Sequence, residues 1–115
     1  MYREFILDHY RNPRNFGSLR GATNSASVYN SLCGDSIQIQ LRLKDDKVLD
    51  ARFSGESCAI ARSSGSLLTE YIKGKSKKKL INLNKAFMIK LIGIEISPVR
   101  LKCLLLPLEA LRKAL

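Results

Sequence analysis

The sequence lacks a long apolar run. No stretch approaches the roughly 18 to 20 uninterrupted apolar residues that a membrane-spanning helix needs. The chain opens with Met1-Tyr2-Arg3-Glu4, which brings charge where a signal peptide would have its apolar core. We therefore expect a cytoplasmic protein with no membrane partner, whose thiols stay reduced.

Acidic residues are scarce relative to basic ones. The chain has 10 acidic and 20 basic residues, a formal net charge of +10 that suits nucleic acid, an anionic surface or an acidic protein. Part of the excess lies close to Gly74, at Lys73, Lys75, Lys77, Lys78 and Lys79. No aromatic residues alternate with these lysines to stack on bases. The segment therefore favours a solvated loop between helices, an acidic partner next, and nucleic acid last.

The chain also lacks internal repeats and low-complexity linkers. Its 115 residues, 45% of them hydrophobic, are enough to bury one core and too few for two. We expect a single domain over residues 1–115.

Three short segments have the pattern of β-strands. Residues 37–43 alternate strictly, with Ile37, Ile39 and Leu41 separated by polar side chains, which predicts a strand with one wet face. A polar turn at residues 44–47 leads to a second strand at 48–53, and a weaker strand precedes at 26–29. The pattern predicts an α+β fold, a three-stranded antiparallel sheet with helices packed on one side.

Other segments repeat apolar residues at helical spacing. A first short helix is expected to end before Asn12-Pro13, and turn residues follow it as far as Asn24. A second helix begins at Cys58 and stops at Gly74. Cys58 would then sit at a helix N-terminus, where the helix dipole and free backbone donors favour a thiolate.

Two more helices are expected in the last third of the chain. Ser76 can cap one that runs without interruption to Gly93, and Ser97-Pro98 begins the other. Pro107 cannot donate the hydrogen bond that the carbonyl of Cys103 would normally receive. We therefore expect a kink or a break beside Cys103.

Cysteine is infrequent, and its number is odd. Three cysteines cannot all pair within the chain, so at least one thiol stays free. With Asp35, two residues after Cys33, the sequence offers three thiolates and a carboxylate, a full tetrahedral shell for a thiophilic metal. A hard oxygen among soft sulfurs would hold the metal more loosely than four thiolates.

Each candidate has an ordinary alternative. No spacing is a compact Cys-x-x-Cys motif, and Cys103 lies among leucines, where a thiol often serves only as a small buried apolar group. Asp35 alone would be a common turn aspartate. His9, the only histidine, is better explained by packing or capping than by metal ligation. Lys102 either lowers the pKa of the neighbouring thiol or points to solvent.

Five motifs carry a resemblance to a known family. They are FILDHYRNPRN at 5–15, CGD at 33–35, GESCAI at 55–60, IKGK at 72–75 and PVRLKC at 98–103. In this order they resemble the IscU/SufU/NifU-N-terminal family of iron–sulfur cluster assembly proteins. The resemblance covers nearly the whole chain, and only the stretch from 75 to 97 lacks recognisable motif residues.

The resemblance implies a scaffold rather than an enzyme. Such a scaffold accepts persulfide sulfur from a cysteine desulfurase, binds iron, builds a transient iron–sulfur cluster and passes it to recipient proteins. Cys33, Asp35, Cys58 and Cys103 match the family's ligands, and Cys103 matches the thiol that receives sulfur. Thiolates suit both roles, because they ligate clusters and attack persulfides.

Departures from the family pattern leave the subtype open. Lys102 stands where IscU-type members have histidine, which favours a SufU-type zinc-dependent sulfurtransferase whose zinc is held by the same four groups. The short 89–97 stretch has no room for the insertion that SufU-type members usually carry. IscU-type members have a Leu-Pro-Pro-Val-Lys motif that docks a chaperone. This chain has ISPVR at 96–100 instead, which speaks against an Hsp70-type partner. A separate alternative, supported by the five lysines between Lys73 and Lys79, is a basic interaction module whose cysteines are buried and inert.

Overall fold

The fold is built on a three-stranded antiparallel sheet. The structure is a computed structural model that describes residues 2–31 and 34–115, with side chains from Glu4 onward. Its strands are β1 (Asn24–Asn30), β2 (Asp35–Lys44) and β3 (Lys47–Ser54), in the order β1-β2-β3. The predicted strands and their antiparallel order are confirmed.

Alternation along β2 creates one apolar face. Ile37, Ile39 and Leu41 are at most 1% exposed, while the polar residues between them are half-buried on the opposite face. The turn from β2 to β3 places Asp45 and Asp46 at φ of 53° and 62°. Two residues with positive φ are typical of the type I′ turn that joins hairpin strands, so the predicted polar turn is confirmed.

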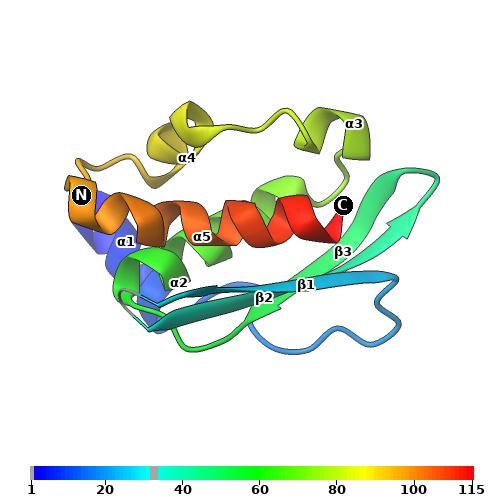
Figure 1. The fold of residues 1–115 in the computed structure, drawn as a ribbon, viewed down its shortest axis with the longest axis horizontal. Helices are drawn as coiled ribbons and strands as arrows, with labels where there is room; N and C mark the ends of the chain where they lie inside the picture. The colour runs from blue at the N-terminus through cyan, green and yellow to red at the C-terminus, as the bar shows by residue number, and fades with distance from the viewer. Residues whose placement is uncertain (1, 32–33) are drawn as a thin grey trace.

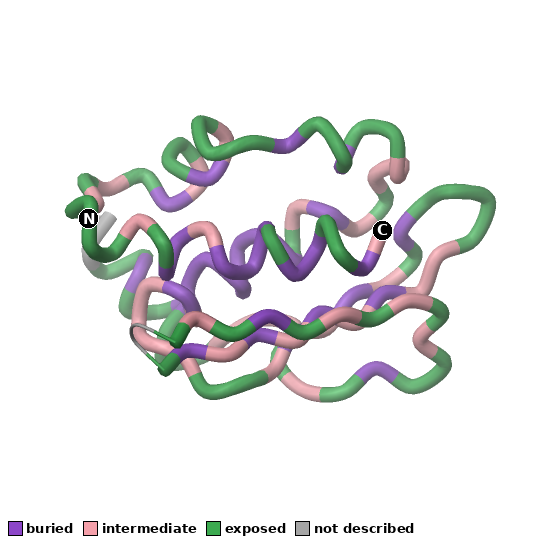
Figure 2. Tube along the Cα trace, viewed as in Figure 1, coloured by how far each residue is buried: buried purple, intermediate pink, exposed green. Residues whose placement is uncertain are grey.

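Helices cover the apolar face of this sheet. They are α1 (Tyr2–Arg11), α2 (Ala59–Ile72), α3 (Lys77–Leu80), α4 (Lys85–Ile92) and α5 (Pro98–Ala114). Figure 1 shows them on the same side of the sheet, with α2 and α5 nearest to it. Buried positions concentrate along these two helices and the strands beneath them (Figure 2).

A close contact brings α2 onto the sheet. A Cβ on Gly65 would lie 2.9 Å from two ring carbons of Phe53, whose own exposure is 0%. Glycine therefore lets the helix approach the ring directly. On its other side α2 contacts α1, where Ser63 Oγ donates to the carbonyl of Ile6 at 3.1 Å. These contacts fix where α2 begins, and with it the position of Cys58.

The helix predicted to run from Ser76 to Gly93 is interrupted, so that prediction is wrong. Ser76 does cap α3, since its side chain accepts the N–H of Lys79 at 3.2 Å. A second cap begins α4, where Asn84 Oδ1 accepts the N–H of Phe87 at 3.0 Å. Asparagine side chains compete for backbone donors and favour caps over helix interiors, which explains the new start.

The last helix is continuous, so of the kink or break that the sequence predicted beside Cys103, the break is absent. α5 contains Pro107 and extends beyond it to Ala114. A proline inside a helix costs about 3 kcal/mol relative to alanine. Burying a leucine contributes about 1.5 to 3 kcal/mol. Leu104, Leu108 and Leu111 are at most 1% exposed, so tertiary packing offsets the cost.

A helix that crosses a bilayer must be both long and apolar. None of the helices in residues 2–31 and 34–115 is long and apolar enough to cross a membrane.

Candidate metal centre

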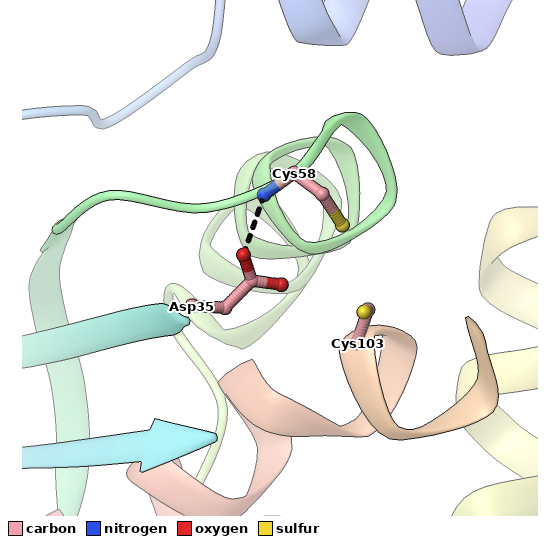
Figure 3. A group of neighbouring side chains, drawn as sticks. All are labelled: Asp35, Cys58 and Cys103. Atoms are coloured by element: carbon pink, nitrogen blue, oxygen red, sulfur yellow. Dashed lines mark hydrogen bonds between the residues drawn. The ribbon is translucent and has the colours of Figure 1, made fainter. Parts of the chain in front are cut away.

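Three potential ligands from three different elements meet at one end of the sheet. Asp35 begins β2, Cys58 is the N-cap of α2, and Cys103 lies near the start of α5. One carboxylate oxygen and the two Sγ atoms all lie within 4.8 Å of one another. Figure 3 shows the three side chains facing a common space. Cys33, the fourth predicted ligand, lies outside the described residues.

Asp35 is fixed by the helix that follows β3. Its side chain is buried, and Oδ1 accepts the backbone N–H of Cys58 at 3.1 Å. Cys58 has extended backbone dihedrals and makes no capping hydrogen bond with its own side chain. The carboxylate therefore supplies an acceptor at the start of α2, where backbone donors lack helical partners. An exposed turn aspartate would not have this contact.

A tight approach between two backbone segments holds the residues before Cys58. Gly55 has φ +124°, and a Cβ there would lie 2.2 Å from the carbonyl oxygen of Ser36. Beside it, the N–H of Ser36 donates to the carbonyl of Glu56 at 2.7 Å. Only glycine fits such a backbone approach at positive φ. The Gly-Glu-Ser-Cys segment is thus pinned to the start of β2, which brings Cys58 to Asp35.

The two described thiols differ in exposure. Cys58 is half-buried, and Cys103 is 4% exposed. Burial alone would suit the packing alternative for Cys103. Packing does not explain why the thiol of Cys58 and the buried carboxylate of Asp35 both lie within 4.8 Å of the Cys103 sulfur and of each other.

The donor set suits a thiophilic metal ion. Thiolate sulfur binds zinc at about 2.3 Å, so two sulfurs on one tetrahedral ion lie about 3.8 Å apart. The present spacing of up to 4.8 Å needs only small side-chain movements to reach that geometry. Two thiolates and one carboxylate would hold the ion, with a further position left for another donor.

Ser57 was not singled out from the sequence. Its Oγ is buried and, unlike the other buried side-chain oxygens that the structure describes, has no hydrogen-bond partner. The only sequence signal is its place directly before Cys58.

His9 and Lys102 lie apart from this group. His9 is buried against α2, and its Nδ1 lies 2.7 Å from Ser66 Oγ. Burial, followed by the nearby Arg14 guanidinium, holds the pKa of His9 below its ordinary value. His9 thus has the packed position that the sequence favoured. Lys102 is exposed and lines a surface cavity of about 310 Å³, as its solvent-facing alternative requires.

Few of the clustered lysines form ion pairs. Lys73 lies 3.6 Å from a carboxylate oxygen of Asp50 and donates to the side chain of Asn15. Lys75 lies over the Tyr71 ring, 4.8 Å from its centroid. The others lie in or next to the short helix α3, so the predicted loop is partly helical.

Comparisons with known proteins agree with the sequence motifs. The model of the NifU-like N terminal domain family matches residues 1–115. The zinc-dependent sulfurtransferase SufU of Bacillus subtilis is 35% identical over 130 residues, covering 98% of this chain and 88% of the relative. The iron–sulfur cluster assembly scaffold protein IscU of Escherichia coli is 37% identical over 122 residues, covering 99% and 91%. The solved structure of FiSufU from Fervidobacterium islandicum AW-1 superimposes with a TM-score of 0.84 at 28% identity, covering 96% of this chain and 93% of that one.

Proposed function

Because the chain belongs to the NifU-like N-terminal domain family, we propose that it is an iron–sulfur cluster assembly scaffold. One observation carries the proposal: Asp35, Cys58 and Cys103, from three separate elements, place their ligand atoms within 4.8 Å of one another. The relatedness to the E. coli scaffold IscU, at 37% identity over nearly the whole chain, supports the same role.

Sulfur would arrive by thiol exchange. The Cys103 thiolate attacks the terminal sulfur of a persulfide on a cysteine desulfurase, and the desulfurase cysteine leaves as a thiolate when its S–S bond breaks. The transferred sulfur then forms the persulfide of Cys103, with no net oxidation. The first turn of α5, where Val99 is 85% exposed, offers the desulfurase a surface to contact next to the buried Cys103.

Iron would enter the same group of ligands as a substrate of assembly. Cys58 and Cys103 supply thiolates, which are the usual ligands of iron–sulfur clusters. Asp35 supplies an oxygen, a harder donor that binds iron less firmly than sulfur does. Cys33 is proposed as the remaining ligand from its place in the sequence. A mixed ligand set of this kind supports release of the cluster to recipient proteins.

The second candidate function is zinc-dependent sulfur transfer. The B. subtilis sulfurtransferase SufU is 35% identical to this chain, and Lys102 replaces the histidine expected of an IscU-type scaffold. In this alternative zinc occupies the same four groups and Cys103 is released to accept sulfur. The alignment with SufU extends over 130 residues against the 115 of this chain, so the relative has residues that this chain lacks. We therefore place scaffolding first.

One experiment separates the two functions. The protein is incubated anaerobically with ferrous iron, cysteine and a cysteine desulfurase, and is then measured by visible and Mössbauer spectroscopy and by metal analysis. A scaffold develops cluster absorption and iron in a cluster environment. Tight one-to-one zinc without any cluster would favour sulfur transfer. If the protein forms no cluster and binds no zinc, both functions are overturned.

A further inference from the structure

Cys103 lies in an enclosed place. It is 4% exposed, and its neighbours in α5 include the buried Leu104 and Leu106. Thiol–disulfide exchange requires the attacking thiolate to reach the sulfur that it attacks. A persulfide on Cys103 would therefore be poorly accessible to a small thiol dissolved in the solvent. A group that releases this sulfur as sulfide is more easily supplied by the protein itself.

The other described thiol lies close to Cys103. The Sγ atoms of Cys58 and Cys103 are within 4.8 Å of each other, and Figure 3 shows both sulfurs directed to the same space. The third member of the group, Asp35, offers a carboxylate, which is not the sulfur nucleophile that the exchange needs. Among the described residues of this group, Cys58 is thus the one that could attack a persulfide on Cys103.

A disulfide between the two cysteines needs only a local movement. An S–S bond is about 2.05 Å long, so Sγ atoms that are at most 4.8 Å apart must approach by at most about 2.8 Å. A change of χ1 between staggered rotamers moves a cysteine Sγ by about 3 Å, which is of the required size. Cys58 is the N-cap of α2, and its side chain makes no capping hydrogen bond that would oppose this rotation.

We propose that Cys58 resolves the persulfide of Cys103. The Cys58 thiolate attacks the Sγ atom of Cys103, and a Cys58–Cys103 disulfide bond forms. The S–S bond of the persulfide breaks, and the outer sulfur leaves with its proton as HS⁻. The Cys58 sulfur is oxidised to a disulfide sulfur while the outer sulfur is reduced to sulfide, so no outside oxidant or reductant takes part. The inference rests on the sulfur-acceptor role of Cys103 proposed above.

This step would produce sulfide beside Asp35, the proposed oxygen ligand of iron. It belongs to the metal-free protein, because the disulfide occupies both thiols that would ligate iron. A dithiol then restores them by exchange, in which its own two thiols become a disulfide and both cysteines are reduced. Cys58 thus acts first as a nucleophile and afterwards as a ligand.

The test uses a cysteine desulfurase that carries its persulfide and has been freed of cysteine. It is mixed anaerobically with the reduced, metal-free full chain in the absence of other thiols. We expect one sulfide for each sulfur accepted, and an intact mass that is lower by two hydrogens. Trypsin without reduction should give peptides 53–62 and 103–112 joined through Cys58 and Cys103, while Cys33 falls in a third peptide, 21–42.

Cys58→Ser removes the nucleophile and keeps the acceptor. We expect this variant to hold its sulfur as a persulfide and to release no sulfide until a dithiol is added. A desulfurase without persulfide serves as the control and should produce neither sulfide nor disulfide.

The wild-type peptide map decides the inference even if Cys58→Ser accepts no sulfur. The inference is overturned if the wild type keeps its persulfide, or if Cys103 is joined to Cys33 rather than to Cys58. Release of sulfide by Cys58→Ser at the wild-type rate would overturn it as well.

Failure of this inference can be told from failure of the proposed function. If the accepted sulfur stays as a persulfide but the protein builds a cluster on reconstitution, only the Cys58 step fails. If the joined peptides form but no cluster does, the scaffold role fails and the Cys58 step stands. A wild type that accepts no sulfur overturns both the acceptor role of Cys103 and the step that depends on it.

Discussion

The carboxylate of Asp35 and the backbone of Cys58 are joined by a hydrogen bond of 3.1 Å between Oδ1 and the N–H. Figure 3 shows the second carboxylate oxygen directed towards the space between the two thiols. One side chain therefore supports the start of α2 and also offers a donor to the candidate metal centre. These two roles can be separated by substitution.

Replacing Asp35 by alanine and by asparagine separates support of the helix from ligation. Asp35→Ala leaves the Cys58 N–H without its acceptor, and we expect the free energy of unfolding of the metal-free protein to fall by about 1.5 to 3 kcal/mol. Asp35→Asn keeps an acceptor oxygen and should lose less. Both variants should weaken Co²⁺ binding, because neither carries the negative charge of the carboxylate. Asp35→Ala should also slow cluster release, because it removes the oxygen donor that binds iron less firmly than sulfur does. Urea denaturation and Co²⁺ titration measure these effects, and equal unfolding energies for the two variants would contradict the hydrogen-bond role.

Single cysteine substitutions should distinguish the sulfur acceptor from a ligand. We expect Cys103→Ser to carry no extra sulfur after incubation with cysteine and a desulfurase, because a serine hydroxyl is not a thiolate nucleophile. Cys58→Ser should still accept sulfur but should fail to hold a cluster. Intact-protein mass spectrometry under anaerobic conditions measures the added sulfur. A persulfide that persists in Cys103→Ser would assign the acceptor role to another cysteine.

The close approach at Gly55 has a matched control elsewhere in the chain. Gly17 has a similar φ of +129° but nothing within 4 Å of an added Cβ, whereas Gly55 would meet the Ser36 oxygen at 2.2 Å. Backbone strain alone should cost either alanine variant about 1 to 3 kcal/mol. We expect Gly55→Ala to lose more stability than Gly17→Ala, and only Gly55→Ala to lose Co²⁺ binding. Equal losses in both variants would show that the contact with Ser36 has no effect.

The lowered pKa of His9 predicts a pH dependence of stability. Burial is the main cause, with Arg14 next, while Asp8 and Glu70 act in the opposite direction. The unfolded chain protonates His9 near its ordinary pKa of about 6.5. The native state does so only at lower pH. Stability should therefore be full above about pH 6.5 and should fall as the pH drops from there to the lowered pKa.

Urea midpoints measured between pH 7.5 and 5 test this dependence. His9→Gln keeps a polar side chain but cannot titrate in this range, so its midpoint should change less with pH than that of the wild type. Parallel curves for the two proteins would mean that His9 does not cause the pH dependence.

The sheet and several helix ends could be predicted because local chemistry determines them. Alternation from Ile37 to Leu43 requires one buried face, and the polar turn at 44–47 sets the hairpin. The start of α2 after Gly55 follows from the change in hydrophobic period. The family motifs also predicted which elements bring Asp35, Cys58 and Cys103 together, a proximity that no local spacing within the chain indicates.

Predictions failed where a tertiary contact competes with a local rule. Pro107 would end an isolated helix, but the buried leucines around it keep α5 intact. The reverse occurs after α3, where Asn84 starts a new helix inside a continuous apolar pattern. Ser57 could not be identified, because only the fold shows which of the described hydroxyls is both buried and unpaired.

Cys103 is only 4% exposed, and this enclosure affects how the proposed sulfur cargo would be delivered. A sulfur atom attached there would be shielded from dissolved oxygen and from small reducing thiols, both of which destroy persulfides in open solution. The donor must then touch this protein before handing over its sulfur. Loading would depend on an encounter between two proteins, and little reactive sulfide would leak into the cell.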